Sequence, residues 1–229
     1  MNEYPKIVTE RFDGANFHIK YCLKFMNKYL KGNILEVGAG CGSFTKHYLN
    51  KEITSITLTE LDQTNILNLN KKFNSYKKIT IIRKKIEEIE EKFDVIIYLH
   101  VLEHIKHDQN EINEASKRLN KNGVLIIMVP AHQKMYSNLD RAVGHFRRYE
   151  TDFFNKKFEF LELSSVKFLD SMGYFLYYLN KFFFKKEVYP SKLKIFIWDK
   201  IFTPLSIVAD FVLRYKFGKC ILAIYKKLN

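Results

Sequence analysis

The chain has 229 residues and carries 38 lysines and arginines against 25 acidic residues, a formal net charge of +13. Its length fits a single domain, and its 47% hydrophobic and 28% charged residues exclude a disordered chain. The three cysteines are odd in number and match no metal-ribbon spacing, so we expect reduced thiols in a cytoplasmic protein. The N-terminal segment has no apolar stretch, and we expect no signal peptide.

Positive charge and aromatic residues gather toward the C-terminus. Residues 131–229 hold 18 lysines and arginines, 9 acidic residues and 23 of the 35 aromatic residues. This composition suits an anionic partner, such as a membrane surface, a phosphorylated or lipid-linked substrate, or nucleic acid. The alternative is that an AT-rich genome enriches lysine, phenylalanine and tyrosine along the whole chain.

Hydrophobic periodicity predicts alternating helices and strands. In chain order, we predict a helix over 16–30 ended by Gly32, a strand over 33–38, a helix over 43–50, a strand over 55–59, a helix over 63–74, strands over 79–82 and 93–99, a helix over 108–120 and a strand over 123–129. The strands are almost continuously apolar, which is typical of a parallel sheet with helices on both faces. Such a doubly wound sheet binds its ligand beyond the carboxyl ends of its strands.

The stretch ILEVGAGCGS, residues 34–43, places Glu36 inside a strand just before a glycine-rich turn. Its glycines form G-x-G-x-G, which fails the dinucleotide fingerprint G-x-G-x-x-G, and an anion beside the turn suits a pyrophosphate poorly. S-adenosylmethionine carries no phosphate, and Glu36 would attract its ammonium group, directly or through water. Glu60, which ends the next strand, would accept hydrogen bonds from both ribose hydroxyls. The glycines would let the backbone approach this ligand closely.

Three motifs together resemble class I S-adenosylmethionine-dependent methyltransferases over residues 30–130: E-x-G-x-G-x-G, the acid ending the second strand, and FDVIIYLHVLEHI around the fourth. The resemblance implies an α/β fold, a Rossmann-like, doubly wound and mostly parallel seven-stranded sheet with residues 218–227 as an antiparallel last strand. It also implies methyl transfer from S-adenosylmethionine. We expect one methyltransferase domain over 1–229, with a cofactor-binding core over 30–167 and a helical cap inserted over 168–217.

A narrower resemblance follows the fifth strand. VPAHQKMYSNLDRAVGHFRRYE, residues 129–150, is similar to a bacterial subfamily with a VPA…LD…GHxRRY signature, and GKCILAIYKK, residues 218–227, resembles its final strand. Such proteins accompany glycosyltransferases in surface-polysaccharide and lipid-linked glycan pathways. This resemblance implies O-methylation of a sugar on a nucleotide-linked or lipid-linked glycan.

Other functions stay open beside glycan methylation. The charge of +13 suits an RNA methyltransferase, but no RNA-binding module is recognisable, so we expect no nucleic-acid partner. A quinone-type small-molecule methyltransferase and a non-catalytic cofactor-binding scaffold are further alternatives, and a dehydrogenase is a distant one.

We assign the cofactor pocket to residues that follow the first four strands: Glu36, Gly38, Ala39, Gly40, Gly42, Glu60, Leu61, Lys85, His100, Val101 and His104. Many class I enzymes have an acid near the adenine after strand three. Here that segment is Arg83-Lys84-Lys85, so the backbone would hold the adenine there.

The segment HVLEH, residues 100–104, has three interpretations. Its histidines line the cofactor pocket, or the segment only caps and packs a helix, or His100, Glu103 and His104 bind a divalent metal. Some quinone-pathway and RNA methyltransferases carry a similar E-x-x-E-H metal motif. In this chain His100 replaces the first glutamate and no further ligand is evident, so we predict no metal.

The segment GHFRRYE, residues 144–150, lies beyond the fifth strand, where an acceptor must sit. An arginine there would offer a fork to a phosphate or carboxylate, and nearby polar side chains, Asp140 among them, would contact the acceptor hydroxyl or take its proton. The candidate catalytic residues are His132, Tyr136, His145, Arg147 and Arg148, with His132 and His145 equal candidates for the base. The alternative is that Arg147 pairs with an internal acid such as Asp140 and only fixes the loop.

The inserted cap over 168–217 mixes aromatic residues with Lys181, Lys185, Lys186, Lys192, Lys194 and Lys200. It either grips a lipid-linked acceptor and rests on the inner membrane face, or packs on the core with solvated lysines. Its apolar stretch over 174–184 is too short to span a bilayer, which takes about 20 residues. Pro190 and Pro204 are predicted to break the cap into separate short helices.

Overall fold

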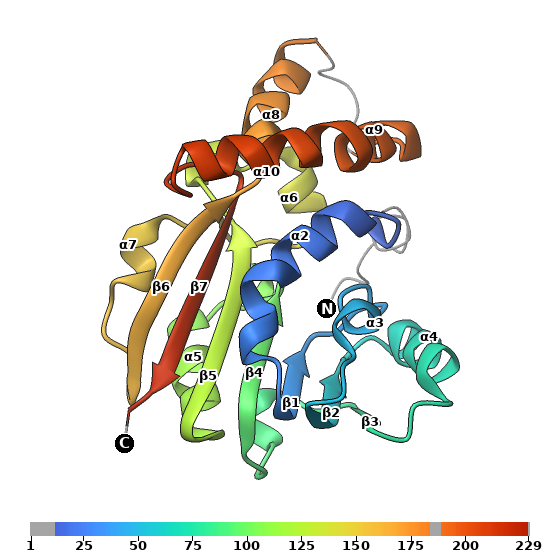
Figure 1. Cartoon of the computed structure of the whole chain (residues 1–229), viewed down its shortest axis with the longest axis vertical. Helices are drawn as coiled ribbons and strands as arrows, with labels where there is room; N and C mark the ends of the chain where they lie inside the picture. Colours follow the sequence, from blue (N-terminus) through green and yellow to red (C-terminus); the bar gives the residue numbers. More distant parts are fainter. Residues whose placement is uncertain (1–11, 184–188, 229) are drawn as a thin grey trace.

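A computed structural model of the chain describes residues 12–183 and 189–228 (Figure 1). Seven strands form one sheet in the order β3-β2-β1-β4-β5-β7-β6. The strands are β1 (Gly32–Val37), β2 (Ile53–Thr59), β3 (Ile79–Ile82), β4 (Phe93–Leu99), β5 (Leu119–Pro130), β6 (Leu161–Leu169) and β7 (Cys220–Lys227). Neighbouring strands from β3 to β5 are parallel, and β7 runs antiparallel between β5 and β6. This sheet confirms the predicted fold class, including the antiparallel last strand.

The central strands are buried on both faces, because their apolar residues point alternately to two cores. Ile34 and Val95 belong to one hydrophobic cluster, whereas Leu35 and Ile96 belong to the other. A strand that buries both faces needs an unbroken apolar run, which explains why the sequence of β4 and β5 carries almost no alternation.

Helices cover both faces of the sheet, as a doubly wound fold requires. Residues of α2 (Asn16–Met26), α3 (Thr45–Tyr48) and α4 (Gln63–Phe73) join the first cluster. Residues of α5 (Asp108–Lys117) and α7 (Thr151–Phe154) join the second.

Several boundaries differ from the prediction. The first helix ends at Met26 and continues as a 3₁₀ turn, η1 (Asn27–Tyr29), and the helix predicted over 43–50 shrinks to the single turn of α3. The fifth strand begins at Leu119 because its first residue pairs with Phe93. The sixth strand, which the sequence prediction does not place, runs to Leu169, two residues past the expected end of the core at 167.

The insertion before β7 is helical and lies across one end of the sheet (Figure 1). It contains α8 (Ser171–Phe183), α9 (Lys192–Ile197), the π-helical turn η5 (Trp198–Phe202) and α10 (Thr203–Val212). The prediction that Pro204 breaks this region is wrong, because α9, η5 and α10 follow one another without a gap. Pro204 lies in the first turn of α10, where its missing N–H and its ring are tolerated after the wider π turn. Among the described residues, no helix is both long and apolar enough to cross a bilayer.

A buried carboxylate fastens this insertion to the rest of the fold. Asp210 of α10 accepts hydrogen bonds from the Tyr21 hydroxyl at 2.7 Å and from the backbone N–H groups of Asp170 and Ser171 at 2.8 and 2.9 Å. Three segments far apart in the sequence, α2, the β6–α8 junction and α10, therefore meet at one side chain.

Candidate functional site

Three glycines shape the turn after β1, for two different reasons. All three have positive φ, which favours glycine: 65° at Gly38, 57° at Gly40 and 67° at Gly42. A Cβ on Gly38 would lie 2.8 Å from the Val101 side chain, and one on Gly42 would lie 2.5 Å from Phe73. No atom among the described residues lies within 4 Å of the corresponding position on Gly40. Gly38 and Gly42 thus permit close packing, while Gly40 leaves room for a ligand against the backbone.

Glu60 joins the end of β2 to this turn. Its Oε2 accepts a hydrogen bond from the N–H of Gly40 at 2.8 Å, and its Oε1 accepts from the N–H groups of Leu61 and Asp62 at 2.7 and 2.9 Å. Each carboxylate oxygen can accept more than one hydrogen bond. Three of about four lone-pair sites of Glu60 are therefore in use beside the open side of Gly40, which leaves room for a ligand hydroxyl, and the ribose assignment stays a prediction.

The Glu36 side chain points into the protein interior. It is almost fully buried in β1, and its Oε2 accepts hydrogen bonds from the hydroxyls of Thr45 at 2.7 Å and Tyr48 at 2.5 Å. Burial raises the pKa of Glu36 in spite of these two bonds. The carboxylate thus anchors α3, and the structure shows no bond from it to the turn. Thr45 and Tyr48 stand three residues apart in the predicted helix, a spacing that could have pointed to a shared partner.

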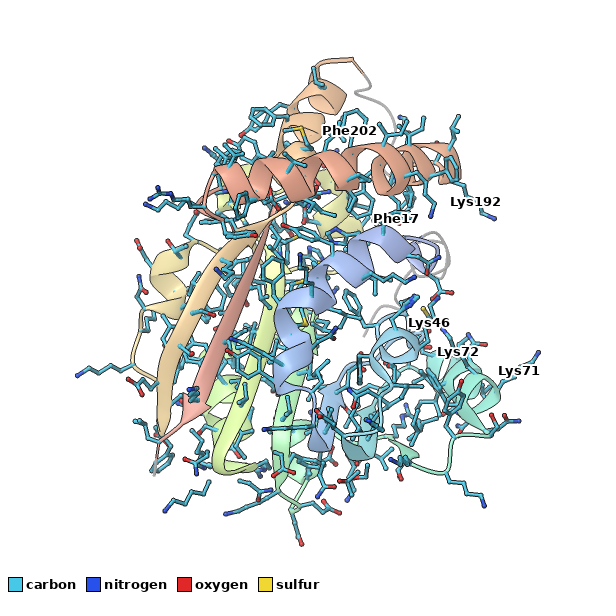
Figure 2. All side chains as sticks on the ribbon, in the orientation of Figure 1. Phe17, Lys46, Lys71, Lys72, Lys192 and Phe202 are labelled. Atoms are coloured by element: carbon cyan, nitrogen blue, oxygen red, sulfur yellow. The ribbon has the colours of Figure 1, made fainter. Side chains whose placement is uncertain are left out.

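Thr59 and Asp13 also hold the turn, although the sequence analysis did not select them. The N–H of Ala39 donates to the Thr59 carbonyl at 2.9 Å. Asp13 Oδ1 accepts from Ser43 Oγ at 2.7 Å and from Lys46 Nζ at 3.1 Å. Figure 2 shows Lys46 on α3. No sequence pattern marks Asp13, because its contacts span about thirty residues.

Lys85 does not join these contacts. Its side chain is exposed, its ammonium lies 3.7 Å from Glu87, and its backbone N–H donates to Glu88 at 2.7 Å. It therefore precedes the 3₁₀ turn η2 (Ile86–Glu88) at the surface. The neighbouring Arg83 donates to the Leu61 carbonyl at 3.1 Å, which ties the ends of β2 and β3 together.

His100 opens the segment after β4 in a strained backbone conformation. Its φ is +58°, which is uncommon outside glycine, and its N–H donates to the Met128 carbonyl of β5 at 2.8 Å. Its Nδ1 lies 3.5 Å from Oε1 of Glu103, a residue of the 3₁₀ turn η3 (Leu102–His104). Val101 fills the space under Gly38, so this part of HVLEH touches the turn directly.

Glu103 is the centre of a histidine cluster. It is fully buried, and among the described residues neither of its carboxylate oxygens has a hydrogen-bond partner. Burial alone would raise the pKa of Glu103, but the imidazoles of His100, His145 and His104 outweigh it, and the pKa is lowered. The pKa of His104 is also lowered, mainly by burial. The cluster thus keeps a buried negative charge among imidazoles.

His145 connects this cluster to Asp140 of α6 (Asn138–Ala142). Its Nδ1 lies 2.8 Å from Asp140 Oδ1, its Nε2 lies 3.8 Å from Glu103 Oε1, and its ring packs edge-on against His104. The structure therefore brings together His100, His104 and His145, which the sequence analysis placed in two separate motifs.

Both arginines of GHFRRYE pair with internal acids. Arg148 is buried and grips Asp140 with two hydrogen bonds, from Nε at 2.9 Å and from Nη2 at 3.0 Å. Arg147 pairs with Asp108, which also accepts from the Tyr149 hydroxyl at 3.0 Å. The predicted acceptor clamp gains no support from these contacts. The alternative, an arginine that fixes the loop, describes both residues, although Asp140 pairs with Arg148 and not with Arg147.

Asp140 keeps its charge inside this network. Burial alone would raise its pKa, but the hydrogen bonds from His145 and Arg148 hold the pKa well below its usual range. The loop after α6 is therefore built around an ionised carboxylate.

His132 and Tyr136 serve the packing of the loop. His132 stacks on Phe168 with ring centroids 5.2 Å apart, its Nε2 lies 3.0 Å from the Gly218 carbonyl, and its Nδ1 lies 3.4 Å from Glu150. Tyr136 donates its hydroxyl to the His145 carbonyl at 2.5 Å. Neither side chain reaches Glu103 through any of these contacts.

A family model for a methyltransferase domain matches residues 16–166, which is well over half of the chain. The chain belongs to this methyltransferase family. The match covers the turn after β1, Glu60 and the cluster around Glu103, and the sheet order is the one that the class I resemblance implied. The chain is an S-adenosylmethionine-dependent methyltransferase. A comparison with curated proteins gives no match.

Solved structures support the fold of the methyltransferase. N-methyltransferase NodS from Bradyrhizobium japonicum, in complex with S-adenosyl-L-homocysteine, aligns with a TM-score of 0.62 at 15% identity, over 100% of this chain and 94% of its own. A chain from the complex of the Haloferax volcanii Trm112 methyltransferase activator with a putative methyltransferase gives 0.67 at 9% identity, over 98% and 95%. Coclaurine N-methyltransferase, bound to N-methylheliamine and S-adenosyl-L-homocysteine, gives 0.63 at 14% identity, over 93% and 72%. At these identities the likeness concerns the fold alone.

The residues at the turn fit the cofactor of this methyltransferase. The open side of Gly40 leaves room for S-adenosylmethionine against the backbone, and Glu60 is fixed beside it with free acceptor capacity. The bound cofactor supplies an activated methyl group, so the protein has to align an acceptor and exclude water.

Proposed function

We propose that the methyltransferase methylates a sugar hydroxyl on a nucleotide-linked or lipid-linked glycan. The observation that supports a hydroxyl acceptor is the pairing of His145 with Asp140. An ionised carboxylate can only accept a hydrogen bond, so His145 Nδ1 donates to Asp140, and in the neutral imidazole Nε2 is then the nitrogen with a free lone pair. An acceptor hydroxyl must lose a proton during methyl transfer, and an unprotonated imidazole can take it.

The sugar is supported by the resemblance of residues 129–150 to the glycan-associated subfamily. Most of the polar residues in that stretch build one loop: Arg148 and His145 converge on Asp140, and Tyr136 holds the His145 carbonyl. The residues of the shared signature therefore hold His145 in place, and we do not assign them to direct contact with an acceptor.

The test is a transfer assay with radiolabelled S-adenosylmethionine and four acceptor pools: nucleotide sugars, a lipid-linked glycan extract, RNA and small amines. We expect label in one of the two sugar pools, and mass spectrometry should place the methyl group on a sugar oxygen. His107→Gln, a change of an exposed histidine outside the cluster, should label the same pool at the same rate.

Three outcomes would contradict the proposal. Transfer to RNA would support the function suggested by the net charge, and transfer to a small amine would support a small-molecule enzyme. Cofactor binding without label in any pool would support a scaffold.

We also propose that the cap rests on an anionic membrane surface through the helix α9–η5–α10. The side of α10 that packs inward carries the polar residues Thr203, Ser206 and Asp210, all buried. Its outward side is apolar, with Val208 64% and Phe211 71% exposed. This polarity is the reverse of that of a helix that faces water.

The apolar face is continuous along the whole segment. We call it the cap face, and its members are Leu193, Phe196, Ile201, Leu205, Val208, Phe211 and Val212, each at least half exposed. Most members stand three or four residues apart, but Phe196 and Ile201 are five apart. The π turn lies at that step, and its wider turn keeps Ile201 in line with the others.

Basic residues flank the cap face, which favours an anionic bilayer over a neutral apolar partner. Lys192 and Lys194 lie at its N-terminal end, where Figure 2 shows Lys192, and Arg214 and Lys216 follow its C-terminal end. Lys185 and Lys186, which the sequence analysis also considered, lie outside the described residues.

A further inference from the structure

The buried cluster after β4 contains three side chains arranged like the ligands of a metal ion. Glu103, His104 and His145 each offer one ligand atom, and these atoms all lie within 4.8 Å of one another. Two of the three come from η3, and the third comes from the loop after α6. The backbone N–H of Phe146 donates to the Glu103 carbonyl at 2.8 Å, which fixes the two segments against each other.

The protein alone does not account for the burial of the Glu103 carboxylate. It is completely buried, and among the described residues neither oxygen has a hydrogen-bond partner. A buried carboxylate is stable only when it is hydrogen-bonded, paired or bound to a cation. Imidazole nitrogens of His100 and His145 lie 3.5 and 3.8 Å from Glu103 Oε1, at and beyond the limit of a hydrogen bond.

We propose that Glu103, His104 and His145 bind a divalent first-row transition-metal ion. Asp140 already performs the supporting role expected at such a site. It accepts from His145 Nδ1 at 2.8 Å, which sets the tautomer and aims the lone pair of Nε2 toward Glu103. Asp140 is itself held by the two hydrogen bonds from Arg148.

The donor set decides which cations fit. Two imidazoles and one carboxylate suit zinc, iron(II) or manganese(II), whereas magnesium prefers oxygen ligands and bound water. Metal–ligand bonds of about 2.1 Å require ligand atoms roughly 3 to 3.5 Å apart. His145 Nε2 and Glu103 Oε1, at 3.8 Å, need only a small closing movement to meet this condition.

A second histidine cluster nearby is a weaker candidate. His18, His100 and Cys220 also place ligand atoms within 4.8 Å of one another. This cluster lacks an unpartnered carboxylate such as Glu103, and burial raises the pKa of the Cys220 thiol to about 12, which disfavours the thiolate in the absence of a metal. His18 is therefore useful as a control, because it shares the histidine-rich surroundings without belonging to the proposed site.

A metal ion at this position would also bear on methyl transfer. A divalent cation would lower the pKa of an acceptor hydroxyl bound to it, and the proton would pass to solvent, because the ion would occupy His145 Nε2. This role rests on the proposed function, whereas binding of the ion does not.

The test is calorimetric titration of the chelator-treated full chain with ZnCl₂, MnCl₂ and MgCl₂, without cofactor or acceptor. We expect one zinc or manganese ion per chain and at least tenfold weaker binding of magnesium. Glu103→Gln and His145→Gln should each weaken binding of the favoured ion at least tenfold, while His18→Gln and the exposed His107→Gln should leave it unchanged.

Thermal unfolding separates a ligand from a merely structural residue. Zinc should raise the Tm of the wild type but not that of Glu103→Gln. Without metal, the Glu103→Gln variant should be at least as stable as the wild type because it buries no charge. Wild-type chain that binds S-adenosylmethionine yet no transition metal would overturn the proposal. Equal zinc affinity of the wild type and both cluster variants would do the same. Neither result would affect the sugar-labelling assay.

Discussion

At the scale of single residues, Glu60 is the side chain on which the cofactor site depends most. It accepts three backbone hydrogen bonds from Gly40, Leu61 and Asp62, and it lies beside the open side of the turn. Its carboxylate therefore both shapes the turn and remains available to a ligand. A substitution should weaken cofactor binding by removing a ligand contact and by loosening the turn.

We predict that Glu60→Ala weakens binding of S-adenosylmethionine about 10- to 100-fold, because hydrogen bonds to a charged group contribute about 1.5–3 kcal/mol. Isothermal titration calorimetry measures the change. Glu52→Ala is the matched control, since Glu52 is exposed at the other end of β2, and its affinity should equal that of the wild type. An unchanged dissociation constant for Glu60→Ala would remove the ribose assignment.

The sequence reflects the backbone geometry of the turn more directly than the contacts of the loop after β5, for a physical reason. Gly38, Gly40 and Glu60 act through local backbone geometry, which a short motif records. The partners of Arg147 and Asp13 lie about thirty to forty residues away in the sequence, where one chain alone gives no sign of contact. His132 and His145 look equivalent in the sequence, and only the folded structure shows that His145 lies against Asp140 and Glu103 whereas His132 stacks on Phe168.

At the scale of elements, a buried carboxylate attaches the cap to α2. Asp210 accepts hydrogen bonds from Tyr21 of α2 and from two backbone N–H groups at the start of α8. Burial raises the pKa of Tyr21 far above its usual range, and Asp210 adds to this rise, so the tyrosine donates as a neutral hydroxyl. Loss of the carboxylate would leave three donors without an acceptor.

We predict that Asp210→Ala lowers the free energy of unfolding by about 3–5 kcal/mol, because buried donors that lose their acceptor are costly. Tyr21→Phe, which removes one donor together with its bond, should lower it by only about 1 kcal/mol. Urea denaturation gives both values, and the exposed Glu91→Ala serves as the control within about 0.5 kcal/mol of the wild type. Equal effects of the two buried substitutions would show that Asp210 does not hold the junction.

The elements themselves differ in how well the sequence predicts them. The strands β3 and β4 match their predicted bounds. For β4 the reason is that a strand buried on both faces must be almost entirely apolar, whereas β3 is an edge strand without a fully buried residue. The helix predicted over 43–50 keeps one turn, since Thr45 and Tyr48 are drawn toward Glu36 and the chain leaves the helix after Tyr48. The prediction for Pro204 fails because a π turn precedes it, and the helix continues through this wider turn into α10.

At the scale of the whole molecule, the cap face and the cofactor site lie at the same end. Figure 1 shows α9 and α10 across the end of the sheet to which the parallel strands point. The turn after β1 and the Glu103 cluster follow strand ends there. A membrane on the cap face would therefore hold a lipid-linked acceptor near the methyl donor. This arrangement links the membrane proposal to the glycan proposal.

We predict that the wild type co-sediments with vesicles containing anionic phospholipid and far less with purely zwitterionic vesicles, and that about 0.5 M salt weakens this binding by screening the flanking lysines and arginines. Val208→Asp combined with Phe211→Asp should reduce the bound fraction at least tenfold, because two charges would enter the apolar layer of the interface. Leu67→Asp, at a 61% exposed leucine of α4, is the matched control and should bind like the wild type. If the wild type stays in the supernatant and instead forms a dimer that the double substitution dissociates, the cap face joins two copies of the chain and the membrane proposal is wrong.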